Sequence, residues 1–190
     1  EIHERLVGSE MCIRDRYDDN AFFRKYSQMD RSVKGLEGAG EWKTLERLLP
    51  DFHDKHVPDL GCGFGWHCRY AAEHGAASVL GVDISAKMIA KARSMGNEGI
   101  IEYRCMPMED ILLPEASFDI VLSSLAFHYT PDFQAVCRNV SRWLKPEGAF
   151  IFSVEHPVFT AQGTQDWHYD ESGQIMHLSL IHISEPTRRS

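Results

Sequence analysis

The chain has 190 residues, of which 43% are hydrophobic and 25% are charged, and its formal net charge is −8. This is the composition of one globular domain with enough apolar residues to form a core. No apolar run has the length of a membrane span, and the acidic balance argues against a nucleic-acid backbone as the main partner.

The two ends of the chain are related to each other at the level of DNA. Residues 1–16 can be written in codons whose reverse complement translates to Leu178–Ser190, followed by a stop codon. That DNA also resembles a transposon adapter used in short-read sequencing libraries. We therefore expect both ends to be adapter-derived artefacts, with the natural domain covering 17–177.

Strands and helices alternate along this domain. Helical periodicity covers Glu41–Leu49, the stretch from the glycines after Leu60 to His74, the segment capped by Ser85, and Pro131–Leu144, which ends at the turn Lys145–Gly148. Strands are expected at His56–Leu60, Ser78–Val82, Ile101–Arg104, Phe118–Ser123 and Ala149–Val154. This alternation predicts an α/β fold with a Rossmann-like, doubly wound, mostly parallel sheet. In such sheets the ligand binds beyond the carboxyl ends of the strands.

A glycine-rich loop follows the first strand. Asp59 ends the apolar run, and Gly61, Gly63 and Gly65 then alternate before a helix begins. Glycine is needed where the backbone adopts positive φ or lies directly against a ligand. The second strand ends in Asp83, which is well placed to accept the hydroxyls of a ribose.

Spacing separates this loop from a dinucleotide site. A dinucleotide fold places its third glycine three residues after the second, but Trp66 stands there. Asp59 would repel a pyrophosphate and would attract an ammonium group. The residues therefore imply a ligand with a ribose and a positive amino group.

Three motifs resemble those of the class I S-adenosylmethionine-dependent methyltransferases. They are Asp59–Gly65, Gly81–Asp83 and Ser117–Ser124, and the likeness covers essentially all of 17–177. The segments Gly61–Tyr70 and Glu155–Thr160 resemble a bacterial small-molecule group, methyltransferase type 11. The resemblance implies S-adenosyl-L-methionine as cofactor and a small-molecule methyl acceptor. The cysteines and histidines show no metal-ligand spacing, so we expect a cytoplasmic enzyme with no metal.

The resemblance also implies roles for individual residues. Asp59 and the loop residues Leu60, Gly61, Cys62, Gly63 and Gly65 would hold the methionine end of the cofactor, and Asp83 its ribose. Ile84 and Met88 would pack near the adenine, and the backbone of Met108 and Glu109 would read the adenine edge. The carbonyls of Ser123 and Ser124 would meet the amino group.

Two departures from the family pattern stand out. Pro58 occupies a usually aliphatic position in a central strand, so either the strand is locally irregular or the residue is a sequencing error. The family also completes its sheet with two further strands, whereas the sequence shows five. We expect a sheet truncated after the fifth strand, and a chain that as written is poorly soluble or inactive because that strand is an exposed edge.

The sequence leaves two alternative roles open for each candidate catalytic or lid residue. His128 and His156 follow the fourth and fifth strands, and each is either a general base or, more often for such residues, a hydrogen-bonding wall residue. Tyr17, Phe22, Phe23 and Tyr26 form either a lid over the cofactor or an ordinary amphipathic helix. Trp167, His168 and Tyr169 either border the substrate or form a loop.

Two other functions stay open at this point. A nicotinamide-dependent oxidoreductase fits the fold but is disfavoured by Trp66 and Asp59. A non-catalytic S-adenosylmethionine-binding protein would carry the same motifs. The four cysteines of the domain, which we interpret as reduced thiols in a cytosolic protein, are Cys62, Cys68, Cys105 and Cys137.

Overall fold

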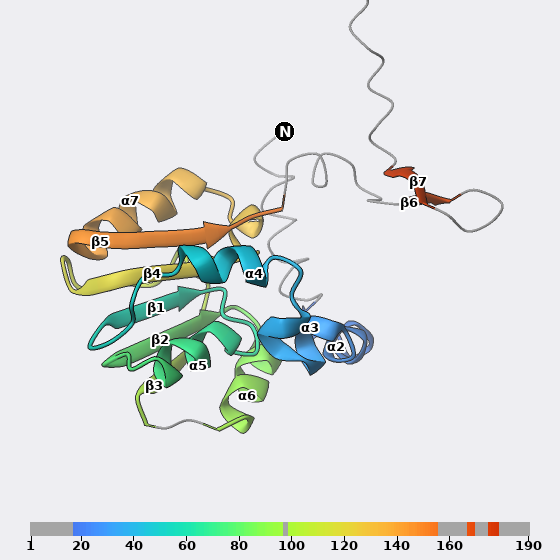
Figure 1. The fold of residues 1–190 in the computed structure, drawn as a ribbon, viewed down its shortest axis with the longest axis horizontal. Coiled ribbons are helices and arrows are strands. Elements are labelled where there is room, and N and C mark those ends of the chain that lie inside the picture. Colours follow the sequence, from blue (N-terminus) through green and yellow to red (C-terminus); the bar gives the residue numbers. More distant parts are fainter. Residues whose placement is uncertain (1–16, 97–98, 156–166, 170–174, 179–190) are drawn as a thin grey trace, which may run out of the picture. The chain divides into compact units, whose positions relative to one another are not determined.

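A computed structural model describes residues 17–96, 99–155, 167–169 and 175–178. The chain divides into two units, Glu1–Ser153 and Val154–Ser190. The first unit contains a five-stranded sheet with the order β3-β2-β1-β4-β5, in which all neighbouring strands are parallel (Figure 1). The predicted doubly wound fold is therefore confirmed.

The elements follow the predicted order. The strands are β1 (His56–Leu60), β2 (Ser78–Asp83), β3 (Ile101–Cys105), β4 (Phe118–Ser124) and β5 (Leu144–Ser153). The helices among them are α5 (Trp66–Glu73), α6 (Ala86–Ser94), the short η3 (Phe127–Tyr129) and α7 (Phe133–Trp143). Ser85 caps α6 as predicted, because its hydroxyl accepts a hydrogen bond from the Met88 amide at 3.2 Å.

The sheet separates two apolar cores. Val79 of β2 packs in the core that includes α5 and α6 residues such as Cys68 and Ile89. Its neighbour Leu80 faces the opposite core, which includes Val136 of α7. Successive side chains of a strand point to opposite faces, so β2 is buried on both sides and reads as a continuous apolar run.

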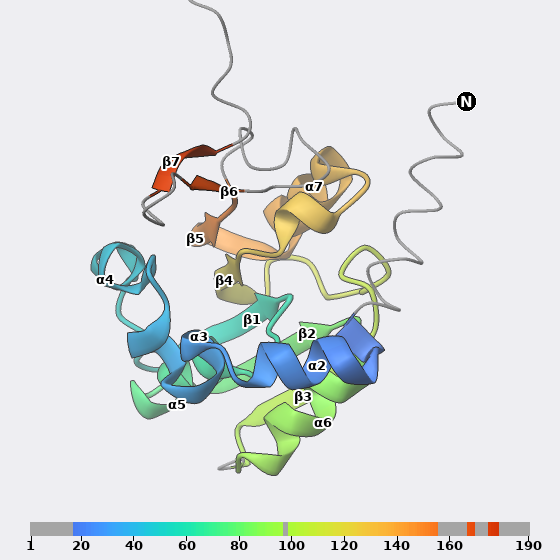
Figure 2. The same ribbon diagram turned by 90° about the vertical axis from the view of Figure 1, so that its right-hand side faces the viewer.

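The N-terminal segment forms short helices ahead of β1. These are α2 (Asn20–Ser27), α3 (Asp30–Val33), η1 (Gly35–Gly38), α4 (Trp42–Leu45) and η2 (Glu46–Leu48). Figures 1 and 2 both show α2 and α3 beyond the carboxyl ends of the central strands. The single helix expected over Glu41–Leu49 is instead α4 continued by a 3₁₀ turn.

β5 begins earlier than predicted. The expected turn Lys145–Gly148 lies inside the strand, because Leu144 already pairs with Phe118. The register then shifts between Phe118 and Ile120, and Glu147 adopts a φ of +65°. The residues Lys145–Gly148, which resemble the end of a helix in sequence, therefore form an irregular part of β5 where its register against β4 shifts.

Pro58 lies buried in the middle of β1, between β2 and β4. The register of β1 runs from His56↔Ser78 to Leu60↔Val82 against β2, but the register against β4 contains only Asp59↔Leu122. Proline has no N–H to donate, so β1 cannot complete its ladders on both sides. This agrees with a locally irregular strand.

The second unit contains an antiparallel hairpin, β6 (Trp167–Tyr169) paired with β7 (Ile175–Leu178). The backbone of Trp167, His168 and Tyr169 is therefore a strand and not a loop. None of the helices in the described part of the chain has the length and apolarity that crossing a membrane requires.

Candidate functional site

The glycine loop turns sharply from β1 into α5. Gly61, Gly63 and Gly65 have φ angles of +76°, +53° and +72°. This left-handed region is readily accessible only to glycine, which explains the alternation in the sequence.

The three glycines face different surroundings. A Cβ on Gly61 would lie 2.3 Å from the Ala126 Cβ, and one on Gly65 would lie 2.3 Å from the Tyr103 hydroxyl. A Cβ on Gly63 would meet no atom within 4 Å. Gly61 and Gly65 are thus required by packing within the protein, whereas Gly63 exposes its backbone to open space.

Asp83 holds the loop in place. One carboxylate oxygen accepts the Gly63 amide at 2.8 Å, and the other accepts the Ser85 amide at 2.9 Å. Burial raises the pKa of this carboxyl, while the two amide hydrogen bonds oppose that rise. A carboxylate has about four lone-pair sites, so Asp83 keeps acceptor capacity for a ligand hydroxyl.

Asp59 is a buried carboxyl with an incomplete set of partners. It is 1% exposed, and its Oδ2 accepts the Cys68 thiol at 3.3 Å. Among the described residues, none hydrogen-bonds its Oδ1. Burial raises the pKa of Asp59 to about 7; the Cys68 hydrogen bond opposes this rise and Asp83 adds to it. Buried polar atoms are nearly always satisfied, so this oxygen has capacity for one more hydrogen-bond donor, although Asp59 is not among the residues that line the pocket described below.

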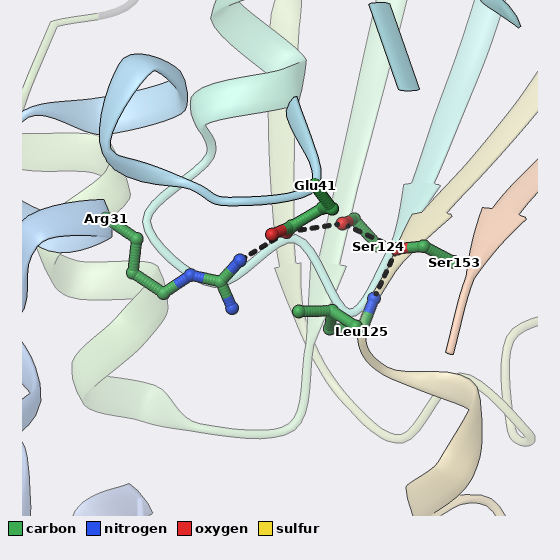
Figure 3. Close-up of polar contacts among 5 residues, drawn as sticks. All are labelled: Arg31, Glu41, Ser124, Leu125 and Ser153. Atoms are coloured by element: carbon green, nitrogen blue, oxygen red, sulfur yellow. Dashed lines mark hydrogen bonds and ion pairs between the residues drawn. The ribbon is translucent and has the colours of Figure 1, made fainter. Parts of the chain in front are cut away.

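A pocket lies between the glycine loop and the N-terminal segment. Its walls include Tyr26, Arg31, Gly61, Gly63, His67 and Ser124. Figure 3 shows a chain of polar contacts at one side of it, running from Arg31 through Glu41 to Ser124 and Ser153. The pocket thus joins the loop, the end of β4 and α3.

Residues 58–152 match the sequence family described as a methyltransferase domain. A ubiquinone biosynthesis O-methyltransferase of Neisseria meningitidis is 30% identical over 179 residues, covering 78% of this chain and 74% of that protein. The chain belongs to the methyltransferase domain family.

Two solved structures support the same assignment. One, from Listeria monocytogenes, is classed as an S-adenosylmethionine-dependent methyltransferase and is 52% identical with a TM-score of 0.68, over 73% of this chain and 65% of that one. The other is an S-adenosylmethionine-dependent methyltransferase from Mesorhizobium loti, 45% identical with a TM-score of 0.67, over 74% of this chain and 64% of that one. The chain spans just under two thirds of each solved structure. These matches confirm the predicted family and its donor, S-adenosylmethionine.

Several predicted ligand contacts of this methyltransferase lie deep in the structure. Leu60 is fully buried, whereas Cys62, also largely buried, is among the residues that line the pocket. The buried Ser123 hydroxyl donates to the Leu60 carbonyl at 2.7 Å and thereby ties β4 to β1. Ser124, in contrast, lines the pocket.

The residues expected near the adenine come from the segments that follow β2 and β3. Ile84 is half-buried after β2, and Met88 is 2% exposed within α6. Met108 and Glu109 are half-buried in the loop after β3, and the Met108 Cε lies 3.6 Å from the Cβ position of Gly61. The structure therefore places Met108 next to the glycine loop, and the contact of all four residues with an adenine stays a prediction.

Of the two candidate catalytic histidines, the structure describes only His128. His128 lies in η3, half-buried, with its ring 4.0 Å from that of Tyr129, and it is not among the residues that line the pocket. His156 lies outside the described residues. A catalytic role for either histidine stays a prediction.

The aromatic residues of the N-terminal segment cover the glycine loop. Phe23 and Tyr26 of α2 lie edge-on to Phe64, at 5.8 and 5.6 Å. The Tyr17 hydroxyl lies 3.2 Å from that of Tyr129. Ahead of α2, the Asp18 carboxylate accepts the Ser85 hydroxyl at 2.6 Å. The segment is thus a short helix packed against Phe64 of the glycine loop, and its role as a lid over the cofactor stays a prediction.

Sequence reasoning missed three polar residues of the pocket wall or its border. Arg31, Glu41 and His67 come from α3, the turn before α4, and the first turn of α5. No spacing in the sequence links them, and only the packing of the N-terminal segment on the loop brings them together.

Proposed function

We propose that this protein transfers a methyl group from S-adenosylmethionine to a small-molecule acceptor. The observation that carries the proposal is the unsatisfied Oδ1 of Asp59 beneath a loop whose Gly63 is open. A phosphate ligand would be repelled by this buried carboxyl, whereas the ammonium group of S-adenosylmethionine would complete its hydrogen bonding.

The remaining contacts are assigned by their positions. The Gly63 backbone would lie against the donor, and Asp83 would accept ribose hydroxyls while keeping its bonds to the loop. Ile84, Met88, Met108 and Glu109 would border the adenine. The carbonyls of Ser123 and Ser124 would accept from the same ammonium as Asp59.

The protein needs to contribute mainly positioning. The sulfonium of the donor supplies an activated methyl group, and fixed alignment of two reactants can contribute about 7–11 kcal/mol. The residues of this chain would hold the donor, and the N-terminal segment that packs on Phe64 would limit the access of water to it. His128 or His156 would act as base only for an acceptor that must lose a proton.

The environment of the enzyme follows from composition and cysteine state. Cys62, Cys68, Cys105 and Cys137 are free thiols, which supports a reducing cytoplasm. The net charge of −8 supports a small-molecule acceptor rather than nucleic acid or an anionic membrane.

Calorimetry with S-adenosylmethionine, S-adenosylhomocysteine and NADH tests the proposal directly. We expect both adenosyl ligands to bind, and Asp83→Asn to weaken them because it removes a charged acceptor. Asp51→Asn, a change at an exposed acid remote from the loop, is the matched control and should bind as the unaltered chain does. Binding of NADH without S-adenosylmethionine would refute the proposal.

Formation of S-adenosylhomocysteine with a panel of small phenols, amines and carboxylic acids then tests catalysis. Donor binding without turnover on any acceptor class would favour a non-catalytic binding protein.

A further inference from the structure

Tyr26 of α2 lines the pocket together with Phe64 of the glycine loop. The two rings lie edge-on, with their centroids 5.6 Å apart. The ring of Tyr26 also meets that of Tyr17 edge-on at 5.8 Å and stacks with that of Phe22 at 6.3 Å. Aromatic packing therefore holds the ring in place, and the hydroxyl is the one polar group of this side chain.

The hydroxyl of Tyr26 lies among the charged groups of the site. Burial raises the pKa of Tyr26; Arg31 lowers it, whereas Asp83 and Glu41 raise it further. Such electrostatic effects fall off with distance, so the hydroxyl lies near both carboxyls. Asp83 ends β2, and Glu41 accepts the hydroxyl of Ser124, at the end of β4, at 3.4 Å. Since β1 lies between β2 and β4 in the sheet, the Tyr26 hydroxyl is close to groups on both sides of the glycine loop that follows β1.

The proposed donor would place its sulfonium in the same region. Its ribose is assigned to Asp83, and its ammonium to the carbonyls of Ser123 and Ser124. In S-adenosylmethionine the sulfonium sulfur joins the ribose to the amino-acid chain, so it lies between these two ends of the molecule. With the ends at β2 and β4, the sulfonium would lie over the glycine loop, where Tyr26 and Phe64 line the pocket.

We propose that the hydroxyl oxygen of Tyr26 contacts the sulfonium end of the methyl donor and makes the site favour the charged donor over its uncharged product. The positive charge of the sulfonium polarises the C–H bonds of its methyl and methylene groups, and a phenol oxygen can accept a weak hydrogen bond from them. S-adenosylhomocysteine has a neutral thioether at this place and gains little from the oxygen. This inference rests on the proposed function and adds to that site a specificity-determining residue that the glycine-loop motif does not contain.

The test compares two ligands that differ only in the transferred methyl group and its charge. Binding of S-adenosylmethionine and of S-adenosylhomocysteine is measured by calorimetry with the 190-residue chain, with Tyr26→Phe, and with Tyr129→Phe as matched control. Tyr26→Phe keeps the ring against Phe64 and removes only the oxygen. Tyr129 carries a phenol that meets the Tyr17 hydroxyl at 3.2 Å, and it is not among the described residues that line the pocket.

A weak hydrogen bond from the sulfonium end predicts that the ratio of the two dissociation constants shifts against S-adenosylmethionine by about two- to fivefold in Tyr26→Phe. S-adenosylhomocysteine should bind this variant as tightly as it binds the unaltered chain. Tyr129→Phe should keep the ratio of the unaltered chain.

An unchanged ratio in Tyr26→Phe would overturn the inference. Equal weakening of both ligands in Tyr26→Phe would also overturn it, because that pattern indicates a structural role, and so would a shift of the same size in Tyr129→Phe. In each of these cases the unaltered chain still binds S-adenosylmethionine, so the proposed function stands. Failure of the unaltered chain to bind either ligand would overturn both.

Discussion

Replacing Asp59 by Asn should change how the stability of the unliganded protein depends on pH. Burial raises the pKa of Asp59 from 3.8 to about 7. Between these values the folded state keeps a proton that the unfolded state has released, so stability falls as pH rises. From pH 5 to pH 7 this amounts to two pH units at about 1.36 kcal/mol each, or about 2.7 kcal/mol, and it levels off above pH 7. Asn cannot ionise, so the Asp59→Asn variant should not lose this unfolding free energy as the pH rises.

Urea unfolding followed by tryptophan fluorescence at pH 5, 6, 7 and 8 measures the effect. The difference in unfolding free energy, Asp59→Asn minus unaltered chain, should increase by about 2–3 kcal/mol between pH 5 and pH 8. Contributions of titrating groups that do not interact with Asp59 cancel in this difference, and so does any constant cost of the buried amide. Two pH profiles that run parallel within about 0.5 kcal/mol would refute the idea that Asp59 is a destabilised buried carboxyl.

Four further predictions test the site and the strand that leads into it. S-adenosylhomocysteine should bind about 30-fold more weakly at pH 5.5 than at pH 8, because protonated Asp59 cannot pair with its ammonium; calorimetry showing a flat profile would contradict this. Gly63→Ala should lower the unfolding free energy by only about 1–2 kcal/mol yet weaken ligand binding at least about tenfold, because its Cβ meets the ligand space and not the protein. Gly65→Ala should lower stability further, since its Cβ would lie against the Tyr103 hydroxyl, and a smaller loss than in Gly63→Ala would count against this packing argument. Pro58→Leu should raise the unfolding midpoint, with a gain of about 1 kcal/mol from the restored backbone donor; an equal or lower midpoint would mean that the proline fits β1 without cost.

Local patterns were sufficient to predict the order of the elements and the glycine loop. The apolar run Val79–Val82 of β2 has no polar interruption because both faces of the strand are buried. The positive φ at Gly61, Gly63 and Gly65 strongly favours glycine at these positions. Asp59 and Asp83 lie next to these signals in the chain, so their place at the carboxyl ends of the strands follows from the parallel sheet. The start of β5 at Leu144, rather than at the predicted Ala149, could not be predicted from local patterns. It depends on the pairing of Leu144 with Phe118, which is distant in sequence.

The surroundings of those residues depended on contacts between segments far apart in sequence. Gly61 and Gly65 resemble ligand-binding glycines equally well, but packing against Ala126 and Tyr103 distinguishes them from the open Gly63. The missing partner of the Asp59 Oδ1 follows from burial beneath the loop and has no counterpart in the sequence. Arg31 and Glu41 show this most clearly, because such residues are common on any helix surface and gain meaning here only where α3 meets the end of β4. The glycine loop and its two acids are adjacent in sequence and could be predicted from it. The charged residues that complete the pocket come from distant segments, so only the tertiary structure brings them together.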